Sequence, residues 1–427
     1  MRQREVAVCG AGIAGIATAY YLAKKYGRSK VALIDRLLPM SLTTSKSGEN
    51  FRDYWPQECM ASFAGRSLDL MEDLANDSDD AFDMRFFGYD FVSESRDNNI
   101  LGVAPLAGPS RRPGSGLKRN RDADAILQQH PHLAQTIRQV LHIERAGALD
   151  VYALGSLMLS RARAAGVELV QATVEAIESV PSGFTLRLNS GGAREPLAAD
   201  RVVLAAGPFT DELARMLGVE LAVESFLQRK ILIPDPEGVI PRTMPFTVFA
   251  DAQVLRWSVE ERELIDADPG YSWLLEEFPG GLHVKPESKD LIKLGWAYNR
   301  TPEPPQWHPV DSIDFPSIVL KGATRFIPGL EQYAGDRIPT PVVQYSGYYT
   351  RTRENWPLIG PLEVDGLYAV TALSGYGTMC ACAAGELCAD WMMDGALPNY
   401  AGHFHPDRRS DPTILAEIDS LESDGQL

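Results

Sequence analysis

The chain has 427 residues, which at about 150 residues per domain suggests two or three domains. It carries 41 Lys and Arg residues against 57 Asp and Glu residues, a formal net charge of −16, and this acidic balance disfavours a nucleic-acid partner. No segment approaches the roughly 18 consecutive apolar residues of a membrane span, and five cysteines do not make a disulfide scaffold in a chain of this length. We therefore expect a globular protein of the cytoplasm.

The first 35 residues follow the order strand, glycine turn, helix, strand and acid. The apolar run 5–9 predicts a buried strand, and residues 30–34 predict a second strand that ends in Asp35. Between them lie a glycine-rich turn and an Ala-rich helix through Ala23. In such a unit one glycine permits the tight turn, the next lets a pyrophosphate approach the backbone, and the third lets the helix pack close to the sheet. These three positions are Gly10, Gly12 and Gly15.

This pattern predicts a dinucleotide cofactor. Its pyrophosphate would meet unpaired N–H groups at the positive end of the helix, where Ile13 and Ala14 lie. Asp35, about 20 residues past the third glycine, can accept hydrogen bonds from the adenosine ribose hydroxyls. A carboxylate at this position disfavours a ribose 2′-phosphate, which leaves FAD and NAD as alternatives.

The remainder of the chain favours FAD, because it does not continue as regular βαβ repeats. Residues 38–52 are polar and small without a sustained period, which is typical of a functional loop. A hydrophobic strand predicted within 200–209 ends in a small-residue turn. Another strand, 366–371, enters the glycine turn 374–378, and a helix is predicted from about 379 to 393. One dinucleotide could use both glycine turns, since each lies at the start of a helix.

Four motifs in this order resemble the D-amino-acid oxidase superfamily of FAD oxidoreductases. They are GAGIAG with its distal Asp35, VVLAAGPFTDELARMLGVEL, GYYTRTRENWPLIGPL, and GLYAVTALSGYGTMCACAAGELCADWMMDG. Within the superfamily the pattern is most similar to the branch of sarcosine oxidase, dimethylglycine dehydrogenase and glycine oxidase. The similarity runs from the N-terminus to about Gly395 and is weakest between Phe82 and Gln139.

The resemblance implies an α/β fold in which a Rossmann-type FAD-binding domain is interleaved with a mixed-sheet α+β substrate domain. We expect the FAD-binding domain to comprise residues 1–81, 140–220 and 343–427. The substrate domain would comprise residues 82–139 and 221–342, where strand signals are frequent.

The resemblance also implies the residues that hold FAD. Its adenosine part is expected near Asp35, Arg36 and the backbone of Val174. The pyrophosphate and ribityl chain are expected near the first glycine turn and the loop Ser45, Lys46 and Ser47. The remaining expected contacts are Arg52, Ala206, Gly207, Gly347, Gly375, Tyr376, Gly377, Thr378 and Met379. Sarcosine oxidases attach flavin through a cysteine at the position of Gly347, so we expect FAD to be bound non-covalently. A helix N-terminus at the second glycine turn would stabilise the negative charge that hydride transfer to flavin N5 places on the pyrimidine ring.

Three residues are candidates for catalysis. Lys293 matches a lysine that lies over the flavin in sarcosine-type oxidases and promotes the reaction with oxygen, although a strand lysine exposed to solvent is the commoner case. Arg52 falls near a basic position close to the flavin. Tyr349 follows Gly347 in the region where glycine oxidases and D-amino-acid oxidases carry an arginine for the substrate carboxylate. In this chain Arg52, Arg351 or Arg353 could replace that arginine, or the substrate could lack a simple α-carboxylate.

We therefore predict an oxidoreductase that oxidises a C–N bond of an amine or amino acid by hydride transfer to flavin N5, giving an imine. Oxygen or an electron carrier would take the electrons, and no metal site is expected because the seven histidines are scattered. An aromatic cluster is expected near the flavin and favours a bulky or aromatic amine. Its expected members are Trp296, Tyr298, Tyr345, Tyr348, Tyr349 and Trp356. Two alternatives remain: oxidation of a 2-hydroxy acid, or a non-catalytic flavoprotein that acts in assembling a complex.

Overall fold

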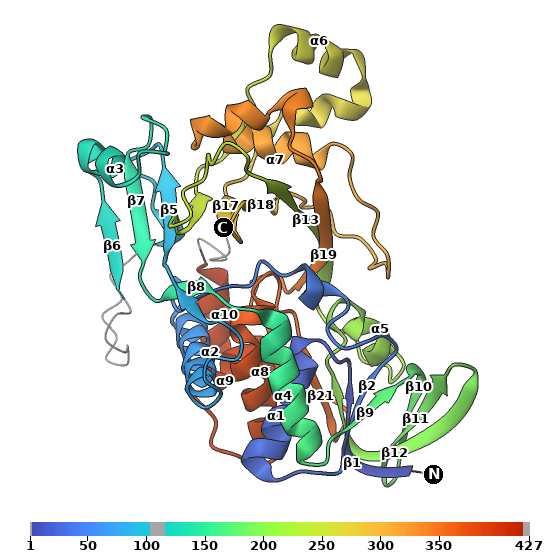
Figure 1. The fold of residues 1–427 in the computed structure, drawn as a ribbon. Helices are drawn as coiled ribbons and strands as arrows, with labels where there is room; N and C mark the ends of the chain where they lie inside the picture. The colour runs from blue at the N-terminus through green and yellow to red at the C-terminus, as the bar shows by residue number, and fades with distance from the viewer. Residues whose placement is uncertain (1, 103–115, 422–427) are drawn as a thin grey trace.

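The computed structural model describes residues 2–102 and 116–421, and it is built around two eight-stranded sheets (Figure 1). The first sheet, with its helices, occupies the lower part of the view in Figure 1, and the second sheet lies above it. Between them, a short three-stranded sheet joins β3 (Asn50–Arg52), β8 (Ala146–Ala148) and β4 (Arg85–Phe86).

The first sheet contains the predicted dinucleotide-binding unit. Its strands run in the order β10-β11-β12-β1-β2-β9, with β21 and then β20 attached to β12. The long strand β12 pairs antiparallel with β11 through its first half and parallel with β21 through its last residues. The bounds are β1 (Arg2–Cys9), β2 (Val31–Asp35), β9 (Glu168–Gln171), β10 (Thr173–Val180), β11 (Gly183–Ser190), β12 (Ala193–Leu204), β20 (Leu358–Pro361) and β21 (Leu367–Thr371). The carboxyl ends of the parallel strands β1, β2, β12 and β21 therefore meet at one edge.

The central strands of this sheet are apolar on both faces because both faces are covered. Val6 and Val8 pack into the cluster formed by the helices on one face, whereas Ala7 and Cys9 pack into a second cluster on the other face. The helices of the first cluster are α1 (Ile13–Tyr26), α2 (Glu58–Asn76), α4 (Val151–Ala164) and α8 (Gly377–Met392). The other face is covered by α5 (Thr210–Arg215), with the short 3-10 turn η3 (Gly207–Phe209) before it.

The second sheet has the order β19-β13-β18-β17-β14-β5-β7-β6 and is antiparallel except where β14 meets β5. Its bounds are β5 (Tyr89–Ser93), β6 (Leu117–Asn120), β7 (Gln139–Ile143), β13 (Glu224–Pro234), β14 (Phe246–Phe249), β17 (Leu282–Glu287), β18 (Leu291–Trp296) and β19 (Val343–Arg351). One face packs on α7 (Phe315–Ala323) around a buried apolar cluster. Because side chains alternate along a strand, every second residue projects from the opposite face, toward the first sheet.

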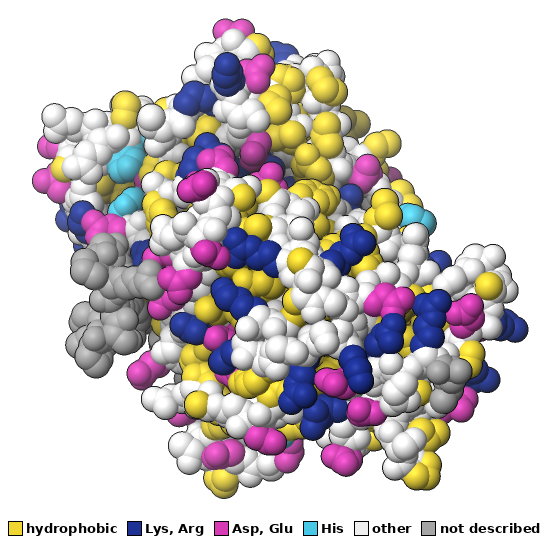
Figure 2. All heavy atoms as spheres, turned by 60° about the horizontal axis from the view of Figure 1, so that its bottom comes forward, with side chains coloured by type: hydrophobic (Ala, Val, Ile, Leu, Met, Phe, Trp, Pro, Cys, Tyr) yellow, Lys and Arg dark blue, Asp and Glu magenta, His cyan; other side chains and the backbone are white. Residues whose placement is uncertain are grey.

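Shorter elements complete the described chain. The short helices are α3 (Ala123–Gln129), α6 (Val259–Ala267), α9 (Ala401–Phe404) and α10 (Pro412–Asp419), and β15 (Gln253–Val254) pairs with β16 (Glu277–Phe278). On the face shown in Figure 2, Lys and Arg side chains are interspersed with Asp and Glu side chains, so this face has no purely basic surface. Within residues 2–102 and 116–421, none of the helices combines the length and apolar character that a membrane span requires.

The predicted α/β fold class with mixed sheets is confirmed. The expected domain boundaries remain a proposal. By sheet membership, β7 and β19 belong to the second sheet, although the expected division assigns residues 140–143 and 343–351 to the FAD-binding part.

Candidate functional site

A large cleft opens where the parallel strands of the first sheet end. It contains about 1530 Å³ of space outside the atoms, open solvent included. Most of the residues expected to bind the cofactor line it: Gly10, Gly12, Ile13, Ala14, Asp35, Arg36, Lys46, Ser47, Val174, Ala206, Gly207, Gly347, Gly375, Gly377 and Thr378. The fold thus brings together side chains and amides from five separate parts of the sequence, 10–47, 174, 206–207, 347 and 375–378.

The first glycine turn is held by close backbone packing. Gly10 has φ +115°, and a Cβ there would lie 2.3 Å from the carbonyl oxygen of Ala205. Gly15 does not line the cleft, but its Cβ would lie 1.9 Å from the carbonyl oxygen of Gly10. The third glycine therefore permits the close contact of helix and strand that the sequence pattern predicts.

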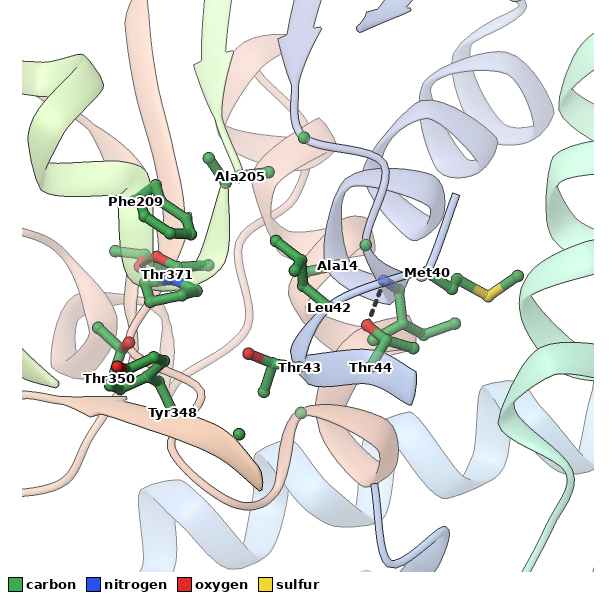
Figure 3. A pocket seen from close by; sticks show the side chains of 18 of the residues that line it. Ala14, Met40, Leu42, Thr43, Thr44, Ala205, Phe209, Tyr348, Thr350 and Thr371 are labelled. Atoms are coloured by element: carbon green, nitrogen blue, oxygen red, sulfur yellow. Dashed lines mark hydrogen bonds between the residues drawn. The ribbon is translucent and has the colours of Figure 1, made fainter. Parts of the chain in front are cut away.

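The start of α1 offers backbone donors to an anion. The N–H of Ile13 donates to the hydroxyl of Thr44 at 3.2 Å, and the N-cap residue, Gly12, carries no side chain that could cap the helix. In Figure 3, Met40, Thr44 and Ala14 lie on one side of the cleft, and Phe209, Tyr348, Thr350 and Thr371 lie on the other. A helix N-terminus facing a cleft in this way is suited to a pyrophosphate.

Asp35 marks the adenosine end of the cleft. Its two carboxylate oxygens accept hydrogen bonds from the N–H of Ala11 at 2.8 Å and the N–H of Leu37 at 2.9 Å. Burial raises the pKa of Asp35, and these backbone hydrogen bonds oppose the rise. The carboxylate is thereby fixed in orientation, with remaining acceptor capacity toward the cleft.

The loop that crosses the cleft contacts the second glycine turn directly. The hydroxyls of Ser47 and Thr378 lie 2.7 Å apart, which joins the loop to the first turn of α8. Lys46 and Ser47 line the cleft, whereas the Ser45 hydroxyl donates to the carbonyls of Ser41 and Leu42. A cofactor role for Ser45 therefore remains a prediction.

An aromatic stack that the sequence did not suggest lies at the adenosine end. Trp307, from the segment 297–314 that connects β18 of the second sheet to α7, stacks on Phe209 with 3.9 Å between ring centroids and 4° between ring planes. The guanidinium carbon of Arg36 lies 4.2 Å from the centroid of the Trp307 ring. Arg36, Phe209 and Trp307 all line the cleft, so the segment 297–314 forms part of its wall.

We expect Trp307→Ala to weaken FAD binding about 2- to 10-fold, because an aromatic contact of this kind contributes about 0.5–1.5 kcal/mol. Flavin fluorescence titration of the apoprotein gives the dissociation constant. Trp307→Phe keeps an aromatic face on Phe209 and should bind FAD nearly as wild type does. Equal affinity in the alanine variant would show that the stack does not contribute.

These features fit FAD as the group held in the cleft. Bare glycine backbone leaves room along its floor; for example, a Cβ built on Gly207 would meet no described atom within 4 Å, its chain neighbours aside. Two helix N-termini, those of α1 and α8, face it, and Asp35 and the aromatic stack lie at one end. The paired helix ends and the acid match the parts of a flavin dinucleotide.

A second cavity adjoins the cleft on the side of the second sheet. The two share Ser47, Lys230, Tyr349 and Gly375. The predicted residues Arg52, Tyr376 and Met379 line this second cavity instead of the cleft. The Arg52 guanidinium is buried and lies 4.7 Å from the Trp55 ring centroid and 5.2 Å from that of Phe91.

The aromatic side chains around the second cavity differ from those expected. Trp296 and Tyr298 pack on the face of the second sheet that is turned away from the cleft, and Trp356 packs among the helices that cover the first sheet. The predicted positions of these three side chains near the flavin were therefore wrong. Tyr348 lines the cleft, Tyr349 lines both cavities, and Tyr345 lines neither. The aromatic lining consists of Trp55, Tyr89, Phe91, Phe246, Tyr349 and Tyr376. Arg351 and Arg353 are absent from the described lining of both cavities, and Arg351 instead lies 4.8 Å from the Phe226 ring centroid.

Lys293 is buried, so the alternative of a strand lysine exposed to solvent is wrong. Its ammonium lies 3.0 Å from a carboxylate oxygen of Glu287 and 3.5 Å from one of Glu49, and its side chain is 10% exposed. Lys285 also pairs with Glu287 at 3.1 Å, and burial lowers the pKa of Lys285 to about 8. Lys293 does not line either cavity, and its role with oxygen remains a prediction.

Comparison with known proteins agrees with this geometry. The sequence model of the family described as "DAO: FAD dependent oxidoreductase" matches residues 5–391. Mouse mitochondrial dimethylglycine dehydrogenase is 26% identical over 257 residues, which are 59% of this chain but only 27% of that protein. The chain thus spans about a quarter of the length of this relative.

Solved structures share the fold at low identity. L-proline dehydrogenase from P. horikoshii superposes with a TM-score of 0.73 at 18% identity, covering 96% of this chain and 98% of that one. Glycine oxidase from Geobacillus kaustophilus gives 0.72 at 18% identity, with 95% and 98% covered. Iminodiacetate oxidase from Chelativorans sp. BNC1 gives 0.68 at 19% identity, with 92% and 96% covered.

Proposed function

Because the chain belongs to the DAO family of FAD-dependent oxidoreductases, we propose that it oxidises the C–N bond of an amine or amino acid to an imine. When bound, FAD would supply the hydride acceptor, flavin N5. The observation that carries the proposal is the second cavity, which adjoins the FAD cleft beside the first turn of α8 and shares lining residues with it. Glycine, iminodiacetate, L-proline and dimethylglycine, after which the similar enzymes are named, each contain a C–N bond.

The lining of the second cavity suits a substrate with an apolar or aromatic body. Trp55 and Tyr376 pack edge to face with 5.0 Å between centroids, and the Tyr376 hydroxyl donates to the carbonyl of Asn355 at 2.5 Å. These contacts hold a rigid apolar wall beside the second glycine turn. Such a wall excludes water and orients a substrate through the shape of the pocket.

We propose that FAD is held non-covalently. Gly347 offers no side chain for attachment, and a Cβ there would lie 3.0 Å from the Cβ of Lys46. Cys9 lines the cleft, but burial raises its thiol pKa to about 12, so it is not a reactive thiolate at neutral pH. Acid precipitation of the purified protein should leave the yellow colour in the supernatant; flavin retained in the pellet would contradict this part of the proposal.

The central experiment is anaerobic mixing of the FAD-loaded protein with panels of amines, amino acids and 2-hydroxy acids. Bleaching of the flavin absorbance by amines alone would support C–N oxidation. Bleaching by 2-hydroxy acids alone would overturn it in favour of C–OH oxidation. If no compound bleaches the flavin and the protein purifies with a stable partner, a role in complex assembly would replace the enzymatic one.

We further propose oxygen as the electron acceptor, with Lys293 favouring its reduction. A buried cation near the flavin would stabilise the negative charge that develops on oxygen. We expect Lys293→Met to slow reoxidation of the reduced flavin about 10-fold or more. Stopped-flow mixing with oxygenated buffer measures the rate, and Lys289→Met, an exposed lysine in the same hairpin, is the matched control. An unchanged rate in the Lys293 variant would remove this role.

A further inference from the structure

The crossing loop, residues 45–49, is joined to the second sheet through its backbone carbonyls. The ammonium of Lys285 on β17 donates to the carbonyl oxygen of Gly48 at 3.1 Å. The ammonium of Lys230 on β13 donates to the carbonyl oxygen of Lys46 at 3.3 Å. A charged donor fixes a carbonyl more strongly than a neutral donor does. Two peptides of the loop are therefore held in place by lysines of the second sheet.

A third lysine of the same sheet contacts the loop through a side chain. Lys293 on β18 lies 3.5 Å from a carboxylate oxygen of Glu49. Lys293 pairs in register with Lys285 on β17 and with Leu232 on β13, two positions from Lys230. Paired residues on neighbouring strands share a face, so the three lysines form a row against the loop.

On its other side the loop is joined to the part of the chain that carries the first sheet. The hydroxyl of Ser47 lies 2.7 Å from that of Thr378, and the N–H of Leu149 donates to the carbonyl of Glu49 at 3.0 Å. Glu49 has φ +62°, in the left-handed region that a residue with a side chain seldom adopts. The loop conformation therefore depends on the contacts that hold it.

Lys285 can act on the cofactor site only through this loop. The residue is 4% exposed and, within residues 2–102 and 116–421, it lines neither the cleft nor the second cavity. Its ion pair with Glu287, at 3.1 Å, does not account for its presence, because Lys293 lies 3.0 Å from the same carboxylate. Burial, and then the charge of Lys293, lower the pKa of Lys285 to about 8, so the ammonium is still protonated at pH 7.

We propose that Lys285 is a positioning residue for FAD that acts through the crossing loop. Its ammonium holds the Gly48 peptide, and this contact keeps Lys46 and Ser47 in the lining of the cleft. Without it the loop leaves the cleft more often, and FAD dissociates faster. The inference concerns the cofactor alone, so it goes beyond the proposed function and applies equally to an amine or a 2-hydroxy acid as substrate.

The test is flavin fluorescence titration of the apoprotein at pH 7. The main variant combines Lys285→Met with Glu287→Gln, which removes one charge of each sign and leaves Lys293 paired with Glu49. We expect the FAD dissociation constant to rise about 10-fold, the loss of one hydrogen bond from a charged donor. The urea unfolding midpoint of the apoprotein should stay close to that of wild type, because replacing a buried ion pair with uncharged side chains is often neutral for stability.

A second measurement follows the loop itself. Trypsin cleaves after lysine, and Lys46 lies in the crossing loop. With FAD at saturation, we expect cleavage after Lys46 to be about 10-fold faster in the double variant, because cleavage of a native protein follows the population of the locally opened state. Mass spectrometry of the fragments identifies the site. Lys289→Met, an exposed lysine in the hairpin of β17 and β18, should match wild type in both measurements.

Two outcomes would overturn the proposal. One is unchanged FAD affinity in the double variant. The other is a loss of affinity that is accompanied by an equal loss of global stability and by no faster cleavage after Lys46, which would make Lys285 a structural residue only. If the double variant does not fold, Lys285→Gln, which retracts the donor from Gly48, takes its place. Failure of every amine to bleach the flavin would remove the proposed function and leave this result unaffected.

Discussion

Replacing Gly15 with alanine should yield a protein that retains no FAD on purification and is strongly destabilised. The added Cβ would lie 1.9 Å from the carbonyl oxygen of Gly10 and 3.4 Å from the Cβ of Ala205. The turn cannot easily move away, because the Gly10 N–H donates to the Ile34 carbonyl at 2.7 Å and the Ala205 N–H donates to the Cys9 carbonyl at 2.8 Å. We expect a cost of at least about 3 kcal/mol in the free energy of unfolding, at the upper end for overpacked cores. Urea unfolding and the flavin-to-protein absorbance ratio measure the two effects.

Gly65→Ala is the matched control, because it makes the same change within a helix. Gly65 lies on α2, and a Cβ built there would meet no atom of the described residues within 4 Å, apart from its chain neighbours and the nearby backbone of its own helix. Alanine should therefore stabilise this helix by about 0.5–1 kcal/mol and leave FAD binding unchanged. Wild-type FAD affinity in the Gly15 variant would mean that the helix can shift away from the turn and that the third glycine is dispensable.

The glycine turns could be predicted from the sequence because their signals are local. The predicted strand 5–9 is the end of β1 (Arg2–Cys9), and the strand ending in Asp35 is β2 (Val31–Asp35). The helix expected from about 379 to 393 is α8 (Gly377–Met392). In each case a short apolar run next to a glycine turn determines the element, and no distant contact has to be known.

The second cavity could not be predicted in the same way, because its walls come from strands far apart in the chain. Tyr89, Lys230 and His283 lie on three strands of one sheet, and their adjacency depends on pairings that no local pattern specifies. Trp307 reaches the adenosine end from a segment without helix or strand, so no periodicity marks it. One error had an available signal: Trp296 is three positions from Lys293 on β18, so the two must project from opposite faces.

Replacing Arg408 with methionine should cost about 3–5 kcal/mol in the free energy of unfolding, because it leaves the charge of Glu354 buried with a weaker partner. Arg408 is 3% exposed, and its guanidinium donates to Glu354 Oε1 at 2.7 Å and to the Pro357 carbonyl at 2.7 Å. These hydrogen bonds fix the segment that connects β19 to β20. In that segment, the carbonyl of Asn355 accepts a hydrogen bond from the hydroxyl of Tyr376, which lines the second cavity. We therefore expect the substitution also to loosen ligand binding in that cavity.

The pH dependence and a neighbouring arginine make this prediction specific. Burial alone would raise the pKa of Glu354, but Arg408 and then Arg409 outweigh it, so its pKa in the folded protein is lowered. A lowered carboxyl pKa contributes stability above the unfolded value of about 4.3. The stability difference between wild type and Arg408→Met should therefore shrink as the pH falls below that value.

The neighbouring arginine is the matched control. The Arg409 side chain also pairs with Glu354 but is 43% exposed, so Arg409→Met should cost no more than about 1 kcal/mol in the free energy of unfolding. Adding Glu354→Gln to Arg408→Met should recover part of the loss, because no buried charge then remains. Equal unfolding midpoints for the two arginine variants would show that burial does not set the strength of this ion pair.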